Sequence, residues 1–264
     1  MSGFVPERLT DYNIENAVNE WINDRDEAEN TYGHISRWDT SRITDMSHLF
    51  SNKIHFNDNI GNWDVSKVVT MYEMFIGAES FNQPIGDWNV SKVRRMGGMF
   101  SQAYAFNQPI GSWNVSKVSE MAYMFLNAQA FNQPIGDWNV SKVTQMESMF
   151  NGAEVFNQPI GDWNVSKVYT MADMFSNTEA FNQPIGNWDV SNLRTIRDMF
   201  NGAIAFNKPI GDWNVSKTTS MEKMFYNAHA FNQPISKWDV SNVTDMYCMF
   251  KNAQAFNQPI GNWD

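Results

Sequence analysis

The chain has 264 residues, of which 42% are hydrophobic and 18% charged, enough apolar material for one or two globular domains and too much for a disordered chain. Its single cysteine excludes an internal disulfide framework and a cysteine-based zinc site. The formal charge of −10 argues against a nucleic-acid binder, which needs a basic surface, and against binding to anionic membranes.

The first 34 residues lack the pattern found in the rest of the chain and predict a helical capping segment over 1–34. Asp11 is a candidate N-cap, and an apolar stripe at helical spacing follows it. A second stretch, Asp26 to Tyr32, continues the pattern. We expect this segment to cover the exposed apolar face of the first repeat. The stripe consists of Ile14, Ala17, Val18, Trp21 and Ile22.

The start of the chain, Met1 to Arg8, has neither the cationic region nor the apolar region of a signal peptide. No apolar run reaches the about 18 residues that a membrane span needs. Asn-Val-Ser glycosylation sequons recur in consecutive repeats, where glycans on every site would collide. These features predict no membrane insertion and favour an intracellular or viral-particle context over secretion.

From residue 35 to residue 264, a motif of 25 residues recurs about nine times without an insertion. A clean copy, Phe131 to Val155, reads FNQPIGDWNVSKVTQMESMFNGAEV. A strict period means that each unit forms one coil and packs its apolar side chains on the same positions of the coils above and below. Ten tryptophans therefore share one column: Trp38, Trp63, Trp88, Trp113, Trp138, Trp163, Trp188, Trp213, Trp238 and Trp263.

Within a unit, Ile85 to Val90 matches the strand signature of a leucine-rich repeat and predicts one short parallel strand. After a candidate N-cap, Ser91, apolar residues at helical spacing predict one or two turns of α or 3₁₀ helix. The fold class predicted is therefore an α/β solenoid, a right-handed stack of leucine-rich-repeat-like coils. The helical positions are Val93, Met96, Met99 and Phe100, and left-handed C-caps are expected at Gly77, Gly152 and Gly202.

The last coil is incomplete, since the sequence stops at Gly261 to Asp264 without a polar capping segment. Solenoids need capped ends for solubility. We expect either that the chain is a fragment of a longer array or that this edge packs against another molecule, as in a homo-oligomer or a larger assembly. The candidate residues for an end-to-end contact are Phe256, Ile260 and Trp263.

The motif WNVSKVTQMESMFNGA, followed by FNQPIGD, resembles the short repeat of the BspA-like leucine-rich-repeat surface proteins, a group catalogued as mycoplasma proteins of unknown function. The opening segment, Leu9 to Phe50, resembles the start of such arrays in marine microbial eukaryotes and their large viruses. The resemblance implies a leucine-rich-repeat-like solenoid and, for some members, surface display, adhesion or protein–protein interaction. It implies no catalytic residues.

Three columns allow a structural and a functional interpretation. The tryptophans occupy an inward position, so we expect core packing, with a carbohydrate-stacking ladder as the alternative. The methionines are expected to fill the core rather than bind a soft metal. The aspartates at one turn position are expected to be solvated, with calcium between coils as the alternative. These aspartates are Asp87, Asp137, Asp162 and Asp212.

No set of residues assembles an active site. The four histidines lie in different columns and form no triad or metal cluster, and Cys248 is expected to be an incidental thiol. We therefore predict no enzyme activity, no cofactor and no metal. An asparagine column without gaps, from Asn57 to Asn257, is expected to bond the backbone of its own and the neighbouring coil.

Positions that vary between coils are free of the demands of stacking and are the best candidates for recognition. They follow Val93 and its equivalents, on the side predicted to be helical. The first hypothesis is a non-enzymatic interaction or scaffold protein with a protein partner, and the alternative is a solenoid that binds polysaccharide on its periodic Trp and Asn/Asp face. The candidate partner-binding residues are Arg94, Arg95, Tyr123, Tyr169, Arg194 and Arg197.

Overall fold

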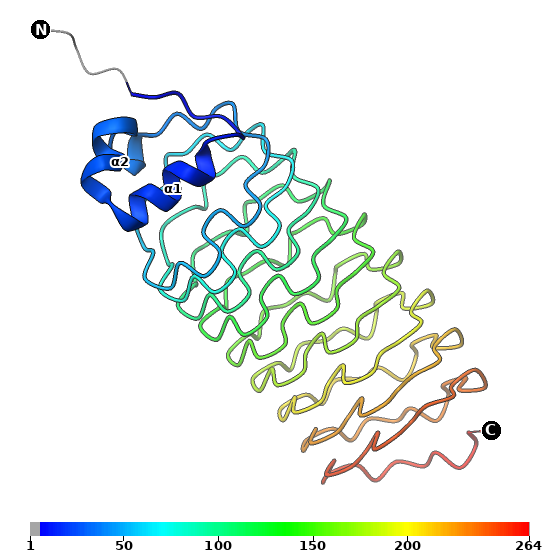
Figure 1. Cartoon of the computed structure of the whole chain (residues 1–264). Helices are drawn as coiled ribbons and strands as arrows, with labels where there is room; N and C mark the ends of the chain where they lie inside the picture. Colours follow the sequence, from blue (N-terminus) through cyan, green and yellow to red (C-terminus); the bar gives the residue numbers. More distant parts are fainter. Residues whose placement is uncertain (1–5, 264) are drawn as a thin grey trace, which may run out of the picture.

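The computed structural model describes residues 6–263. Residues 1–5 and 264, which include the start of the expected cap and the end of the last coil, lie outside the described residues. Two α-helices, α1 (Ile14–Asn23) and α2 (Arg25–Tyr32), and a 3₁₀ helix, η1 (Ile35–Arg37), come first. A stack of 25-residue coils follows, with the helices at one end and the C-terminus at the other (Figure 1).

Helix α1 forms because its apolar residues recur on one face, and that face is buried against the first coils. Polar contacts fix its position. The Trp21 Nε1–H donates to Asp58 at 2.9 Å, and the Thr44 N–H donates to Asp11 at 2.8 Å. Asp24 caps α2 by accepting from the Glu27 N–H. Within residues 6–263, neither helix combines the length and the apolar character that a membrane span requires.

The core is a set of aromatic and aliphatic columns that run along the stack. Phe100 lies 3.8 Å from Phe106 of the following coil, centroid to centroid, and 5.7 Å from Phe125. Both phenylalanine columns are nearly parallel stacks, and Trp88 stacks on Trp113 at 6.4 Å. Each buried large apolar side chain contributes about 1.5–3 kcal/mol. The period is thus the packing unit of the core.

The predicted α/β solenoid with one strand and one short helix per repeat is wrong. In the described coils, the backbone consists of turns, with eight isolated parallel bridges between single residues and no regular strand or sheet. The expected strand cannot form because its N–H groups close turns within the coil, as in Trp88 N–H to Ile85 O and Val93 N–H to Val90 O. The bridge falls instead at Arg95, inside the segment predicted to be helical.

The expected helix after Val93 fails for a second reason. One residue in each coil at this place has a positive φ, for example Glu73 (53°) and Tyr123 (61°), which stops a right-handed helix. Alternate N–H groups then point along the stack to the next coil: Met96 to Glu120 O at 3.1 Å and Phe100 to Met124 O at 2.9 Å. We call this segment, 94–102 and its equivalents, the backbone ladder. The glycines expected in the left-handed region, Gly77, Gly152 and Gly202, have φ values of 66°, 70° and 69°.

The opposite side of each coil is held by side chains. Segment 82–93 and its equivalents make no backbone-to-backbone hydrogen bond to another coil among the described residues. The Trp113 Nε1–H donates to Ile85 O at 3.2 Å, and the Asn157 N–H donates to Asn132 Oδ1 at 3.0 Å. The predicted bond from the asparagine column to the backbone of the neighbouring coil is therefore confirmed, whereas residues 6–263 show no bond from these side chains to the backbone of their own coil.

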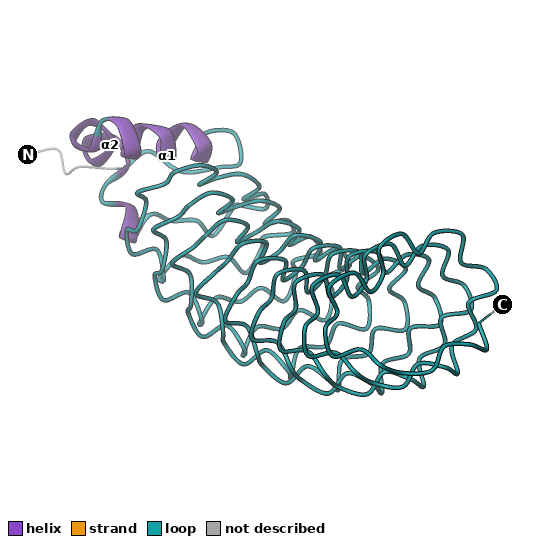
Figure 2. Cartoon of the chain, turned by 90° about the horizontal axis from the view of Figure 1, so that it is seen from below, coloured by secondary structure: helices purple, strands orange, loops and turns teal. Residues whose placement is uncertain are grey.

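The two sides of the stack differ in spacing. Ring centroids in the Phe50-to-Phe250 column, which belongs to the backbone ladder, are 5.3–5.8 Å apart. Three tryptophan pairs on the other side stack at 6.0–6.4 Å. Figure 2 shows that the stack forms an arc. From the closer spacing on the ladder side, we infer that the ladder side is concave and the tryptophan side convex.

Candidate interaction surface

All six predicted partner-binding residues lie on the ladder side. Arg94, Tyr169 and Arg194 occupy one column, in which the Arg194 N–H donates to Tyr169 O at 3.0 Å. Arg95 is in the neighbouring bridge column. Arg197 lies two residues after the bridge position of its coil and Tyr123 lies three residues after it, and both side chains are exposed. We call these four columns, at 94, 95, 97 and 98 and their equivalents, the concave surface. It brings the six residues onto one face.

Several of these side chains bond to one another across coils, in two networks. In the first, the Arg95 guanidinium lies 2.9 Å from Glu120 and 4.8 Å from the centre of the Tyr72 ring. Gly97 leaves the room for this contact, because a Cβ there would lie 2.9 Å from Glu120 Oε1 and 3.1 Å from the Tyr72 ring. The intervening coil is thus covered by side chains of its neighbours.

The second network spans three coils. Arg197 lies 3.3 Å from Asp173 and 4.0 Å from Glu147, and it reaches Glu147 over the small, buried Ala172. Burial raises the pKa of Asp173, and Asp198 and Glu147 raise it further against the attraction of Arg197. Burial, with a hydrogen bond to Glu147, raises the pKa of Tyr123 to about 12. Acidic groups here outnumber the arginine that neutralises them.

Sequence reasoning placed Glu120 and Glu147 in the variable columns but predicted no contact for them, and it did not identify Tyr72 and Asp173 as members of this surface. Their signal was present in the columns, since a glycine or alanine in one coil lets long side chains of the coils on either side meet. The variable positions are therefore partly committed to contacts within the chain. Arg94, Tyr169 and Arg194 form none of the ion pairs found in residues 6–263 and present exposed side chains.

The tryptophan column is buried. The rings of Trp63 to Trp238 are 3–4% exposed, so they offer no face on which a sugar ring could stack. The methionine columns are likewise in the core, with Met71 and Met74 fully buried. No group of three or more His, Cys, Asp or Glu side chains arranged to hold a metal occurs in the part of the chain that the structure describes.

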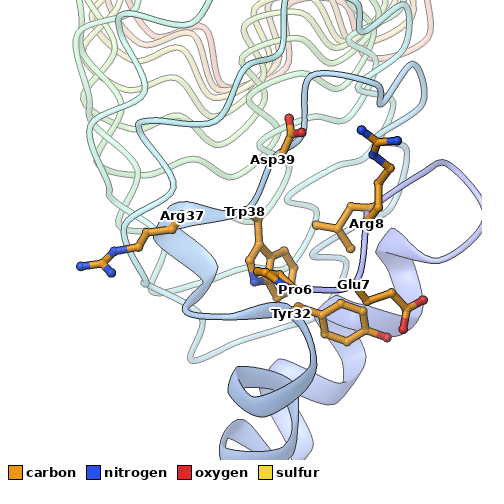
Figure 3. Close-up of a pocket in the computed structure, with 8 residues that line it drawn as sticks. Pro6, Glu7, Arg8, Tyr32, Arg37, Trp38 and Asp39 are labelled. Atoms are coloured by element: carbon orange, nitrogen blue, oxygen red, sulfur yellow. The ribbon is translucent and has the colours of Figure 1, made fainter. Parts of the chain in front are cut away.

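A cavity of about 450 Å³ lies beside α2 and η1 (Figure 3). Pro6, Tyr32 and Trp38 gather in it, and the Tyr32 and Trp38 rings meet edge to face at 5.8 Å. Arg37 points away from them in Figure 3. The Glu7 N–H donates to Thr31 O at 2.9 Å. The Glu7 hydrogen bond ties the N-terminal segment to α2, and the contact between Tyr32 and Trp38 ties α2 to the first coil.

The three residues predicted for an end-to-end contact lie on the last coil. Phe256, Ile260 and Trp263 are partly buried, whereas the same positions in earlier coils are fully covered. Trp263 stacks on Trp238 at 6.3 Å. Its Nε1 is buried without a hydrogen-bond partner.

The repeat matches the model of a known family. The model of the family described as "Mycoplasma protein of unknown function, DUF285" matches residues 17–135, 110–207 and 181–264. The chain belongs to this family. The three overlapping matches follow the coil stack from α1 to its last coil. A comparison with curated proteins found no significant match.

Proposed function

We propose that the protein is a non-enzymatic interaction scaffold that binds a protein partner on its concave surface. The observation that carries this proposal is the bend toward the columns that vary between coils. Curved repeat proteins use extended concave surfaces for binding. Tyrosine and arginine, the residue types enriched in the energetic centres of protein interfaces, both occur there, at Arg94, Tyr123, Tyr169 and Arg194.

The resemblance of the repeat motif to BspA-like surface proteins supports display or adhesion as the setting of this contact. The alternative of a polysaccharide on a tryptophan ladder is not proposed, because the tryptophan rings are buried. Assembly through Phe256, Ile260 and Trp263 stays a prediction. Light scattering over a range of concentrations tests it: a mass that rises to that of a dimer supports the contact, and a constant monomer mass opposes it.

The scaffold proposal is tested by replacing Arg94, Arg95 and Tyr169 together with alanine and measuring the affinity for a partner isolated with the wild-type chain. We expect a loss of at least about tenfold, since truncating one interface centre costs about 2 kcal/mol or more. A matched triple variant on the convex side, with Asp87, Asp137 and Asp162 replaced by alanine, should bind as the wild type does. Unchanged affinity of the first variant would overturn the proposal.

A further inference from the structure

A row of cations runs along the stack at the edge between the convex face and the backbone ladder. One position holds a lysine in five consecutive coils, and all five side chains are exposed. None of them is among the ion pairs formed by residues 6–263. We call this row the lysine stripe: Lys67, Lys92, Lys117, Lys142 and Lys167.

Four of the five lysines have no acidic residue three positions earlier, whereas Lys67 follows Asp64, and hydrogen bonds from a nearby serine together with the charge of Lys67 lower the pKa of that carboxyl. The exposed residue three positions earlier is a neutral asparagine in four of these coils. Where that residue is an aspartate further along, at Asp189 and Asp239, the stripe position holds Asn192 and Asn242 instead of lysine. Like charges one coil apart repel each other. The stripe thus concentrates positive charge on a chain whose formal net charge is −10.

A second row of donors accompanies the lysines: Asn89, Asn114, Asn139 and Asn164. Each Oδ1 accepts the N–H of the serine two residues later, as in Asn139 and Ser141 at 3.2 Å. The Nδ2 groups of these exposed asparagines donate no hydrogen bond within the described chain, so they point unpaired donors at solvent. Ammonium and amide groups together present donors at the spacing of the coils.

We propose that the lysine stripe and its asparagine row bind a linear acidic polysaccharide along the axis of the stack. Such a chain repeats a carboxylate with each uronate and offers hydroxyl and ring oxygens between them, which match Nζ and Nδ2 donors repeated once per coil. A single-stranded nucleic acid fits less well. It would need exposed aromatic rings for base stacking, and Trp88 and Trp113 are 4% and 3% exposed.

The proposal concerns a different face from the concave surface and is tested separately. Binding of hexagalacturonate to the full chain is measured by calorimetry, with maltohexaose as the neutral probe. We expect saturable binding of the acidic chain alone. If about four lysines pair with carboxylates of the ligand and each pair releases about 0.7 ion, the dissociation constant should rise about 50-fold between about 50 and about 200 mM salt.

The variant with Lys92, Lys117, Lys142 and Lys167 replaced by glutamine should lose this binding and its salt dependence. The control variant carries the same change in net charge elsewhere, with Lys208, Lys223, Lys237 and Lys251 replaced by glutamine, and should bind within about twofold of the wild type. Equal losses in both variants, equal binding of maltohexaose, tighter binding of oligothymidylate, or no binding at low salt would each overturn the proposal.

Discussion

The asparagine column gives the sharpest test of how the convex side is held. Asn132 Oδ1 accepts two hydrogen bonds from the next coil, from the Asn157 N–H at 3.0 Å and from Gln158 Nε2 at 2.9 Å. Within residues 6–263, Asn182 Oδ1 accepts only the Asn207 N–H, at 3.0 Å, because Lys208 replaces the glutamine. The same side chain therefore makes two bonds in one coil and one in another.

Replacing Asn132 with alanine should lower the free energy of unfolding by about 2 kcal/mol, and replacing Asn182 should lower it by about 1 kcal/mol. These values follow from about 1 kcal/mol for each hydrogen bond lost, since both sites are only partly buried and water reaches the orphaned N–H groups. The measurement is urea unfolding followed by tryptophan fluorescence, with midpoints compared at equal slope.

The variant Gln158→Lys supplies the control, because it places a lysine opposite Asn132, where Lys208 stands relative to Asn182. In that background, Asn132→Ala should cost about 1 kcal/mol. Equal effects of Asn132→Ala and Asn182→Ala in the wild-type background, or effects below about 0.5 kcal/mol for both, would refute the reasoning that the column satisfies the backbone of the neighbouring coil.

Three further outcomes are expected. Gly136→Ala should destabilise the chain by about 1–3 kcal/mol in thermal unfolding, because the added Cβ would lie 2.4 Å from a proline carbonyl oxygen of the next coil. Gly261→Ala should be neutral, because no atom lies within 4 Å of the position of its Cβ. Equal effects of the two substitutions would contradict the close approach at Gly136. Asp173→Asn should raise the free energy of unfolding at neutral pH, because burial raises the pKa of the folded carboxyl and its ionisation therefore opposes folding. The gain should appear as the pH rises above 3.8, the ordinary pKa of the carboxyl, and vanish below it. A gain confined to low pH would refute the raised pKa. In absorbance titration, Tyr123 should ionise near pH 12, and Glu147→Gln should lower its pKa; no change would exclude the contact between them.

The sequence alone predicted the columns of the core but not the backbone that carries them. Trp88, Phe100 and Met99 repeat at a fixed period, and a fixed period without insertions demands stacking of equal side chains. The helical spacing of Val93, Met96 and Phe100 was misleading, because turns closed by i to i−3 bonds can also place every third or fourth residue inward. The prediction of a helix therefore failed while its inward residues were right.

The positive φ at position 98 and its equivalents explains why turns replaced the predicted helix; unlike the left-handed conformation of Gly77, Gly152 and Gly202, it could not be foreseen. The left-handed position is held by Glu73, Tyr123 and Asp173 as well as by Gly98, so residue type gave no sign of it. The networks of the concave surface were hidden for a related reason. Arg197 reaches Glu147 only because the residue between them is Ala172, and this relation appears when coils are compared in register.

The central claim, that the concave surface binds the partner, is tested most directly by site-specific photocrosslinking in the full chain. A photoreactive side chain is placed in turn at Tyr169 on the concave surface and at Asp162 of the same coil on the convex side. The account predicts an adduct with one protein partner from position 169 and none from position 162. Adducts from position 162 alone, or equal adducts from both, would contradict it.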